Sequence, residues 1–390
     1  MQRIEGTIQP YAWGSHTFIP ELLGTEPTGE PQAELWLGAH SSSPARVGGR
    51  GLDELVAADP DTFVGSASVA QFGPVLPYLL KVLAAAEPLS LQAHPSRAQA
   101  EAGFAAENAA GLALDAPDRT YRDNWPKPEM LCALGQADVL CGFREPASTY
   151  ALFAELGVEP ALELVQPLQE GSASALREVF GRILTMGTAD LHIVTAVIDA
   201  ARQVQDGPLA EFAQTARDLA DRYPEDPGVL AALVMNRLRL QQYEAVFLSA
   251  GNLHAYLHGS GVEIMANSNN VLRGGLTSKH VDVDELMRVL DFTSGFPGLV
   301  ICVEERPGVW AYQTPAPEFA LWRLQVDSEP VQVPAFGTGR VLLVLEGAVT
   351  ARTGDQELRI DRGQSVFFTA GEDPQLQGHG VGFLAGPGVG

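Results

Sequence analysis

Glu244-Ala-Val-Phe-Leu-Ser-Ala-Gly-Asn-Leu-His254 and Gln364-Ser-Val-Phe-Phe-Thr-Ala-Gly-Glu-Asp-Pro374 follow the same pattern. In each segment, an apolar run typical of a buried strand leads into a turn of small residues. The first segment then reaches a histidine, and the second reaches a proline at the corresponding position. The sequence therefore predicts two similar β units, of which only the first has a potential metal ligand here.

This pattern resembles the cupin superfamily, in which a metal-binding histidine occupies the position of His254. We therefore expect two cupin-like jelly rolls, one with a metal ion and one without. Many short strands at regular spacing support a barrel or jelly roll. The segments predicted as strands are residues 4–8, 33–37, 78–83, 130–139, 245–248, 261–265, 298–303, 319–326, 340–345, 347–351, 358–360 and 365–369.

The middle of the chain has a different pattern. Between residues 148 and 241, apolar residues recur at helical spacing, and Gly-Pro and Pro-Glu-Asp-Pro-Gly breaks separate the periodic runs. We expect an all-α insert in a mainly β protein. Its predicted helices are residues 150–156, 173–185, 191–204, 209–222 and 229–240. A further helix is predicted over residues 96–110, with Ser96 as its N-cap.

These patterns divide the chain into three expected domains. Residues 1–147 and 242–318 form a metal-binding catalytic jelly roll, residues 148–241 form the helical insert, and residues 319–390 form a metal-free jelly roll. The length of 390 residues, long for one domain, agrees with this division. We expect the insert to shape the entrance of the catalytic pocket and to supply no metal ligand.

Composition narrows the classes of partner. The formal net charge of −23 argues against nucleic acid or an anionic membrane as a partner. No run of eighteen apolar residues exists, so no transmembrane helix is expected. The chain has three cysteines and no Cys-x-x-Cys pair, which favours reduced thiols. Its first residues do not resemble a signal peptide, so we expect a cytoplasmic protein. The chain has three lysines, Lys81, Lys127 and Lys279, in or near the motifs below.

Three short motifs can contribute to one metal site: Leu89-Ser-Leu-Gln-Ala-His-Pro95, Pro126-Lys-Pro-Glu-Met130 and Ala250-Gly-Asn-Leu-His-Ala-Tyr256. Residues i and i+2 of a strand face the same side, so Gln92 and His94 would point at one spot. The same holds for Lys127 and Glu129. Two imidazoles, a carboxylate and an amide oxygen form a ligand set suited to zinc, manganese or iron.

Each motif also has a plain structural explanation. A histidine in a strand is more often a buried structural residue, so neither His94 nor His254 is convincing alone. Glu129 differs, because a carboxylate entering the apolar run Met-Leu-Cys-Ala-Leu is costly to bury without a partner. That partner could be a metal ion or Lys127. The four candidate ligands together favour the metal ion.

Asn267-Ser-Asn-Asn-Val-Leu-Arg-Gly-Gly-Leu-Thr-Ser-Lys279 is rich in residues that favour tight turns. It is either a surface turn with solvated cations or a loop whose Arg273 and Lys279 clamp phosphate or a charge developing on substrate oxygens. Trp13 is either a core aromatic residue or a surface on which a sugar stacks. His40 is not expected to be a metal ligand.

In combination, these motifs resemble the type I mannose-6-phosphate isomerase (phosphomannose isomerase) family. The resemblance implies an aldose–ketose isomerase that interconverts mannose 6-phosphate and fructose 6-phosphate through a cis-enediol. We expect a cytoplasmic monomer whose partner is this small sugar phosphate. The resemblance covers nearly the whole chain in order, through Tyr11-Ala-Trp-Gly, Glu34-Leu-Trp-Leu-Gly-Ala-His40, Leu89-Ser-Leu-Gln-Ala-His-Pro95, Lys127-Pro-Glu, Ala250-Gly-Asn-Leu-His-Ala-Tyr256 and Val271-Leu-Arg-Gly-Gly-Leu-Thr277.

The resemblance also implies roles for individual residues. One zinc ion per chain would polarise the oxygens at C1 and C2. Its ligands would be Gln92, His94, Glu129 and His254. The catalytic residues would be Arg273 and Lys127. The residues expected to bind substrate are Ser90, Lys81 and Lys279, to which we add Glu263 and Trp13.

Two departures from the family pattern affect the acid/base chemistry. Pro126 occupies the place of a histidine in Asn-His-Lys-Pro-Glu, and Asn269 the place of an aspartate in Ser-Asp-Asn-Val. Both missing groups are acid/base candidates in the family. The base here could instead be a zinc-bound water, which we favour, or Lys127 or Glu263.

Two other functions stay open on the sequence. The first is a catalytically weakened cupin protein that binds a sugar phosphate without efficient turnover. The second is a cupin iron oxygenase, which usually has a two-histidine, one-carboxylate site with open positions. A glutamine ligand and the set of lysines fit the oxygenase poorly.

Overall fold

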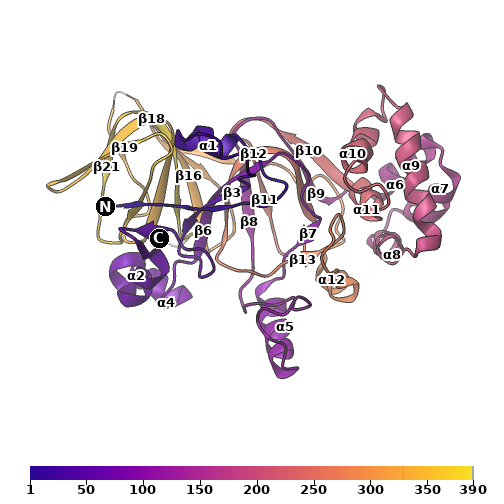
Figure 1. Cartoon of the computed structure of the whole chain (residues 1–390), viewed down its shortest axis with the longest axis horizontal. Coiled ribbons are helices and arrows are strands. Elements are labelled where there is room, and N and C mark those ends of the chain that lie inside the picture. Colours follow the sequence, from indigo (N-terminus) through magenta and orange to yellow (C-terminus); the bar gives the residue numbers. More distant parts are fainter. Residues whose placement is uncertain (328, 389–390) are drawn as a thin grey trace.

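The computed structural model describes residues 1–327 and 329–388. A ten-stranded sheet forms the middle of the molecule, a nine-stranded sheet lies at one end, and a group of helices lies at the other end (Figure 1). The predicted mainly β, cupin-like fold with a helical region is confirmed. Among the helices of the described residues, none has the length and apolar character needed to cross a bilayer.

One long strand, β12, organises the ten-stranded sheet. Its first residues pair with β7 and β9, and its remaining residues pair with β6 and β8. The strands are β2 (Thr7–Gln9), β3 (Glu34–Gly38), β6 (Tyr78–Ala85), β7 (Gln92–Ala93), β8 (Glu129–Ala133), β9 (Ala137–Phe143), β10 (Met235–Leu240), β11 (Ala245–Leu248), β12 (His254–Ala266) and β13 (Leu272–Arg273).

Both faces of β6 are buried, which explains its nearly continuous apolar sequence. Leu80 and Val82 pack in a core that lies between the two large sheets. Leu79 and Leu83 alternate with them and lie on the opposite face, which we call the inner face. Lys81, the charged residue of this strand, also lies on the inner face, where its ammonium group needs a partner.

The nine-stranded sheet begins earlier in the chain than predicted. Its strands are β1 (Gln2–Ile4), β14 (Cys302–Arg306), β15 (Val309–Tyr312), β16 (Ala320–Val326), β17 (Val331–Gln332), β18 (Arg340–Thr353), β19 (Gln356–Asp361), β20 (Ser365–Phe368) and β21 (Gln375–Gly386). The expected boundary at residue 319 separates β15 from β16, although Trp310 pairs with Arg323 across these strands. The hairpin of β14 and β15 therefore belongs with the C-terminal strands, and β1 joins them from the N-terminus.

The two repeated segments occupy corresponding places in the two sheets. In each sheet a four-residue strand, β11 or β20, leads through a turn to a long strand, β12 or β21. His254 is the first residue of β12, whereas Pro374 immediately precedes β21. The turn before β12 requires glycine at position 251, because its φ is 75° and a Cβ there would lie 2.8 Å from the Val289 carbonyl oxygen.

The helical region contains α6 (Pro146–Leu156), α7 (Glu159–Val165), α8 (Ala173–Leu184), α9 (Leu191–Gln203), α10 (Ala210–Ala220) and α11 (Gly228–Leu233), with short 3₁₀ turns at Gln166–Glu170 and Thr188–Asp190. The predicted helix over residues 229–240 is wrong in its second half. There, Leu238 and Leu240 are buried and alternate with Arg237 and Arg239, which pair with Asp138 on β9. This period of two belongs to a strand, β10.

The remaining elements show further differences from the prediction. The helix predicted after residue 96 is confirmed as α5 (Arg97–Ala109), with Ser96 and Gln99 forming a capping box. Segment 130–139 is two strands, and segments 340–345 and 347–351 are one strand, β18. The strand predicted over residues 4–8 is two strands, the end of β1 and the start of β2. Of the strand predicted over residues 298–303, only residues 302 and 303 are in a strand, at the start of β14. Elements too short for a clear period were missed: α1 (Phe18–Leu23), α2 (Leu52–Ala58), α3 (Pro60–Val64), α4 (Ser66–Phe72), α12 (Val283–Val289) and the hairpin β4 (Arg46–Val47) and β5 (Arg50–Gly51).

Candidate metal centre

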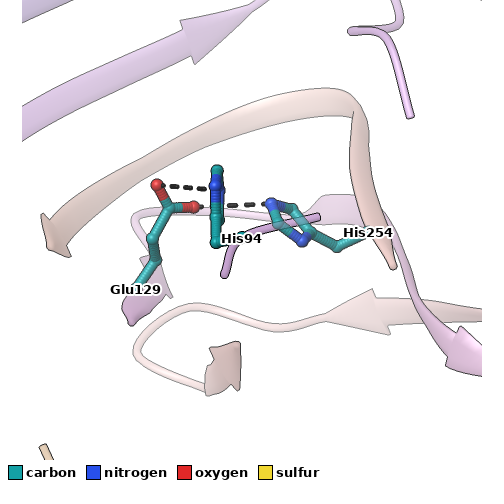
Figure 2. Close-up of side chains that lie close together, drawn as sticks. All are labelled: His94, Glu129 and His254. Carbon is teal, nitrogen blue, oxygen red and sulfur yellow. Dashed lines mark ion pairs between the residues drawn. The ribbon is translucent and has the colours of Figure 1, made fainter. Parts of the chain in front are cut away.

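His94, Glu129 and His254 converge on one point, as Figure 2 shows. His94 follows β7, and the other two residues begin β8 and β12. All three are buried, and one ligand atom from each lies within 4.8 Å of the others. The Nε2 atoms of His94 and His254 lie 3.3 and 3.4 Å from the two carboxylate oxygens of Glu129. Three segments distant in the sequence therefore form one site.

Strand register places Gln92 beside this group. Gln92 pairs with His254 across β7 and β12, and with Arg273 across β7 and β13. Directly opposite residues of antiparallel strands project to the same face, so Arg273, Gln92 and His254 form a row. The amide nitrogen of Gln92 lies 3.4 Å from the Ser90 hydroxyl. This contact leaves the amide oxygen available as a ligand.

The hydrogen bonds of the two imidazoles show that the group fits a metal cation. His94 Nδ1 lies 2.9 Å from the Asn270 carbonyl, and His254 Nδ1 lies 3.1 Å from the Asn252 carbonyl. A carbonyl oxygen only accepts, so each Nδ1 carries the proton and each Nε2 presents a lone pair. His94 Nε2 is buried without a hydrogen-bond partner. Two lone pairs directed at a carboxylate require a cation between them, and imidazole and carboxylate donors suit zinc.

Burial and neighbouring charges favour the ligand forms of these side chains. Burial lowers the pKa of His94 to about 4, although Glu129 opposes this shift, so the imidazole stays neutral. Burial raises the pKa of Glu129, but its neighbours, among them the Lys127 ammonium, outweigh burial and hold this pKa well below its usual value. The Lys127 ammonium lies 3.2 Å from Glu129 Oε1. Glu129 is therefore a carboxylate anion in the site.

A second buried network on the inner face fixes Lys81. Its ammonium lies 2.8 Å from Glu263 and 3.5 Å from Glu34, and these carboxylates outweigh burial and raise the Lys81 pKa. The other Glu263 oxygen accepts a hydrogen bond of 2.9 Å from the Tyr256 hydroxyl. Trp36 donates to Glu34 at 2.6 Å and lies beneath Lys81. Both Glu263 oxygens are thus occupied, and the network orients the lysine.

The cations of the expected site fall into two groups. Lys81 and Lys127 have carboxylate partners, whereas Arg273 and Lys279 form no ion pair with the described residues. Burial and the charges of Arg273 and Arg122 lower the pKa of Lys279, and burial and Arg122 lower that of Arg273. Arg122, Arg273 and Lys279 thus lie near one another without an ion pair among the described residues, an arrangement of charge that favours an anion. We missed Arg122, although it lies in the same segment as Lys127.

Asn270, also missed, joins three segments of the site. This residue is fully buried. Its side-chain oxygen accepts from the Arg122 amide at 2.8 Å, and its nitrogen donates to the carbonyls of Asp123 and Trp125 at 2.8 and 2.9 Å. Its own carbonyl orients His94. Asn270 therefore holds the segment before Glu129, a ligand histidine and the Arg273 loop together.

The other predicted substrate-binding residue, Trp13, lies at the edge of the inner face. It is half-buried, stacks on Tyr11 with ring centroids 5.7 Å apart, and packs against the core that contains Leu83 and Tyr256. In the part of the chain that the structure describes, no hydrogen bond or ring contact joins the Trp13 side chain to His94, Glu129 or His254. Pro126 is buried and Asn269 is exposed, and neither side chain can exchange a proton near neutral pH.

Comparison with known proteins places this site in a family. Residues 1–146 match the catalytic domain of type I phosphomannose isomerase. Mannose-6-phosphate isomerase of Escherichia coli is 37% identical, with 97% of this chain and 98% of that protein covered. The human mannose-6-phosphate isomerase is 31% identical, with coverage of 95% and 93%.

Solved structures agree over the full length. A mannose 6-phosphate isomerase bound with zinc and yttrium has a TM-score of 0.92 and 34% identity, and each chain is covered completely. The apo form of the Salmonella typhimurium enzyme has a TM-score of 0.92 and 33% identity, with 100% of this chain and 99% of that chain covered. From its ligand cluster, its fold and these relatives, the chain belongs to the type I phosphomannose isomerase family.

Proposed function

We propose that this chain is a metal-dependent isomerase that interconverts mannose 6-phosphate and fructose 6-phosphate through a cis-enediol. The observation that carries the proposal is the buried pair of imidazole lone pairs directed at Glu129, in a chain similar to mannose-6-phosphate isomerases along almost its whole length. Gln92, His94, Glu129 and His254 would hold one zinc ion. When bound, the ion polarises the substrate oxygens at C1 and C2 and makes the adjacent C–H groups more acidic.

We assign the substrate phosphate to the cations without carboxylate partners. Lys279 and Arg122 lie on the exposed side of this group, and Arg273 is half-buried beside Gln92 in the ligand row. A phosphate dianion would replace the mutual repulsion of the cations with attraction. Arg273, closest to the ligands along the row, would also offset the negative charge that develops on the enediolate oxygens.

The proton that moves between C1 and C2 requires a group close to the ligands. Glu263 has one oxygen against Lys81 and the other against Tyr256, which supports an orienting role. Lys127 contacts Glu129. The Lys127 ammonium is a proton donor, so we assign to it the donation of a proton to a substrate oxygen, and to Glu263 the positioning of Lys81. A water molecule at the metal site would accept the proton from carbon.

The helical region supports the site from outside. Gly228, the first residue of α11, lies so close to the Arg273 loop that a Cβ there would be 2.6 Å from the Leu276 backbone nitrogen. We therefore propose that the helical residues 148–233 act as a separate domain that shapes the pocket entrance through this contact, because residues 235–240 form β10 of the ten-stranded sheet. We place the boundary between the two jelly rolls just before β14, because β14 and β15 pair with the C-terminal strands. We also propose that the protein acts as a cytoplasmic monomer.

The test is a coupled assay for fructose 6-phosphate formed from mannose 6-phosphate by the zinc-loaded protein. Turnover that disappears with a chelator supports the isomerase. Saturable binding of mannose 6-phosphate without product would instead identify the weakened sugar-phosphate-binding protein, which the similarity to catalytically named relatives does not favour.

A further inference from the structure

His40 lies on the inner face, one row beyond the row that contains Glu129. The cross-strand partners Gly38, Leu79, Met265 and Glu129 form a row through β3, β6, β12 and β8. Backbone hydrogen bonds continue this pairing past the ends of the strands: Asn267 donates to the Pro77 carbonyl beside β6, and Ala266 donates to the Pro128 carbonyl beside β8. Two residues further along each strand, the next row on this face contains His40, Asn267 and Lys127.

The environment of His40 fixes its neutral tautomer. The Ser42 backbone N–H donates to His40 Nδ1 at 3.3 Å, and the Ser42 hydroxyl lies 2.8 Å from the same atom. A backbone N–H only donates, so Nδ1 is the acceptor and Nε2 carries the proton. Burial, with the charges of Lys81 and Lys127, lowers the His40 pKa to about 4. The ring is therefore neutral near pH 7, with Nε2–H directed away from Ser42.

Packing alone does not account for an imidazole at this position. The His40 ring meets Trp36 edge to face, with centroids 4.8 Å apart, and a phenyl ring would make that contact equally well. His40 is only 2% exposed, yet Nε2 has no hydrogen-bond partner among the described residues. This nitrogen is not among the fully enclosed polar atoms that lack a partner in the described residues, so it belongs to the small part of the side chain that stays accessible, where a ligand oxygen can accept its hydrogen.

We propose that His40 contacts the substrate, donating its Nε2–H to an oxygen of the sugar phosphate bound beside Lys127. The inference rests on the proposed function, because that function supplies the ligand. A neutral donor suits this place, since it can stabilise an oxygen that gains negative charge without adding a third cation next to Lys81 and Lys127. Trp36 positions the ring, and Ser42 keeps the proton on Nε2.

The direct test is a long-range ¹H–¹⁵N correlation spectrum of the zinc-loaded protein labelled at histidine nitrogens, with His40 assigned from the His40→Phe spectrum. Between about pH 6 and pH 8, where a free imidazole titrates, His40 should stay in the Nε2–H form. Its Nε2 signal should shift when fructose 6-phosphate is added. An imidazolium, an Nδ1–H tautomer or an unchanged Nε2 signal in an actively isomerising sample would overturn the inference.

Kinetics provide the second test. His40→Phe keeps the ring contact with Trp36 and removes the donor, so kcat/KM should fall by about 10- to 100-fold while bound zinc stays at the parent level. His192→Phe, at an exposed position of α9, is the matched control and should behave like the parent. An unchanged kcat/KM, or loss of zinc, in His40→Phe would overturn the inference. A parent protein without isomerase activity would contradict the proposed function instead, while the tautomer of His40 could still be measured.

Discussion

His94 Nδ1 lies 2.9 Å from the backbone oxygen of Asn270, so one residue orients a metal-ligand candidate and also holds the segment that leads to Glu129. Such outer contacts fix the tautomer and direction of a ligand imidazole. The metal site should therefore respond to changes at Asn270, even though its side chain contacts no ligand atom.

We predict that Asn270→Asp weakens zinc binding by about 10- to 100-fold. The substitution replaces the donor to the Asp123 and Trp125 carbonyls with an oxygen that repels them. A competition titration with a chromophoric chelator measures the affinity. Asn108→Asp, at an exposed position of α5 where the side-chain oxygen accepts from Arg119, is the control. Parent-like zinc affinity in Asn270→Asp would remove this residue from the metal site.

Lys81→Met should destabilise the metal-free protein more than Glu263→Gln. The methionine leaves Glu263 and Glu34 buried without their cation, whereas the glutamine leaves Lys81 paired with Glu34. Breaking a buried pair typically costs about 3–5 kcal/mol, and we expect Lys81→Met in that range. Urea unfolding in the presence of a chelator measures both variants. Equal stabilities would show that Glu34 does not share the lysine.

Gly228→Ala should lower kcat, although residue 228 lies outside the ligand cluster. A Cβ at this position would force the Leu276 backbone, and with it the Arg273 loop, to shift. Gly181→Ala on α8 is the matched control, because its Cβ would meet only the flexible end of Met287 at 3.4 Å. The measurement is the steady-state kcat of both variants. A parent-like kcat in Gly228→Ala would mean that the Arg273 loop does not depend on this contact.

Substitutions of Arg273 and of Arg122 should change different kinetic constants, kcat for the first and KM for the second. Arg273→Ala should lower kcat more than it raises KM, because its main interaction forms with the enediolate. Arg273→Lys should also be poor, since the planar guanidinium fork is lost. Arg122→Ala should mainly raise KM, as expected for a phosphate anchor. A change confined to KM in Arg273→Ala would make it a second phosphate anchor.

Local sequence predicted the elements that have a clear period or cap. Ser96 and Gln99 signal the start of α5, and the apolar run around Leu80 signals β6. The strand β10 was missed because the apolar helix α11 runs directly into it, and the alternation that begins at Arg237 is only a few residues long.

The candidate site was predictable where its residues sit in short motifs, and less so where tertiary pairing creates the contact. His94, Glu129 and His254 converge as expected. Asn270 gains its contacts from segments distant in the sequence, and His40 reaches the row of Lys127 only through strand pairing, so local patterns carry no signal for their place in the site. The ion pairs of the predicted cations could not be predicted either: Lys81 and Lys127 contact inner-face carboxylates, whereas Arg273 and Lys279 have no ion pair among the described residues.

We propose that one metal ion, held by the buried histidines and Glu129, makes this chain an isomerase. The most direct measurement is isomerase activity on mannose 6-phosphate during zinc titration of chelator-treated protein, for the parent, His94→Ala and His254→Ala. We predict that parent activity is lost on chelation and returns in proportion to bound zinc up to one ion per chain, while both variants stay folded without zinc or activity. Full zinc content in both variants, or full activity in the chelated parent, would contradict the claim.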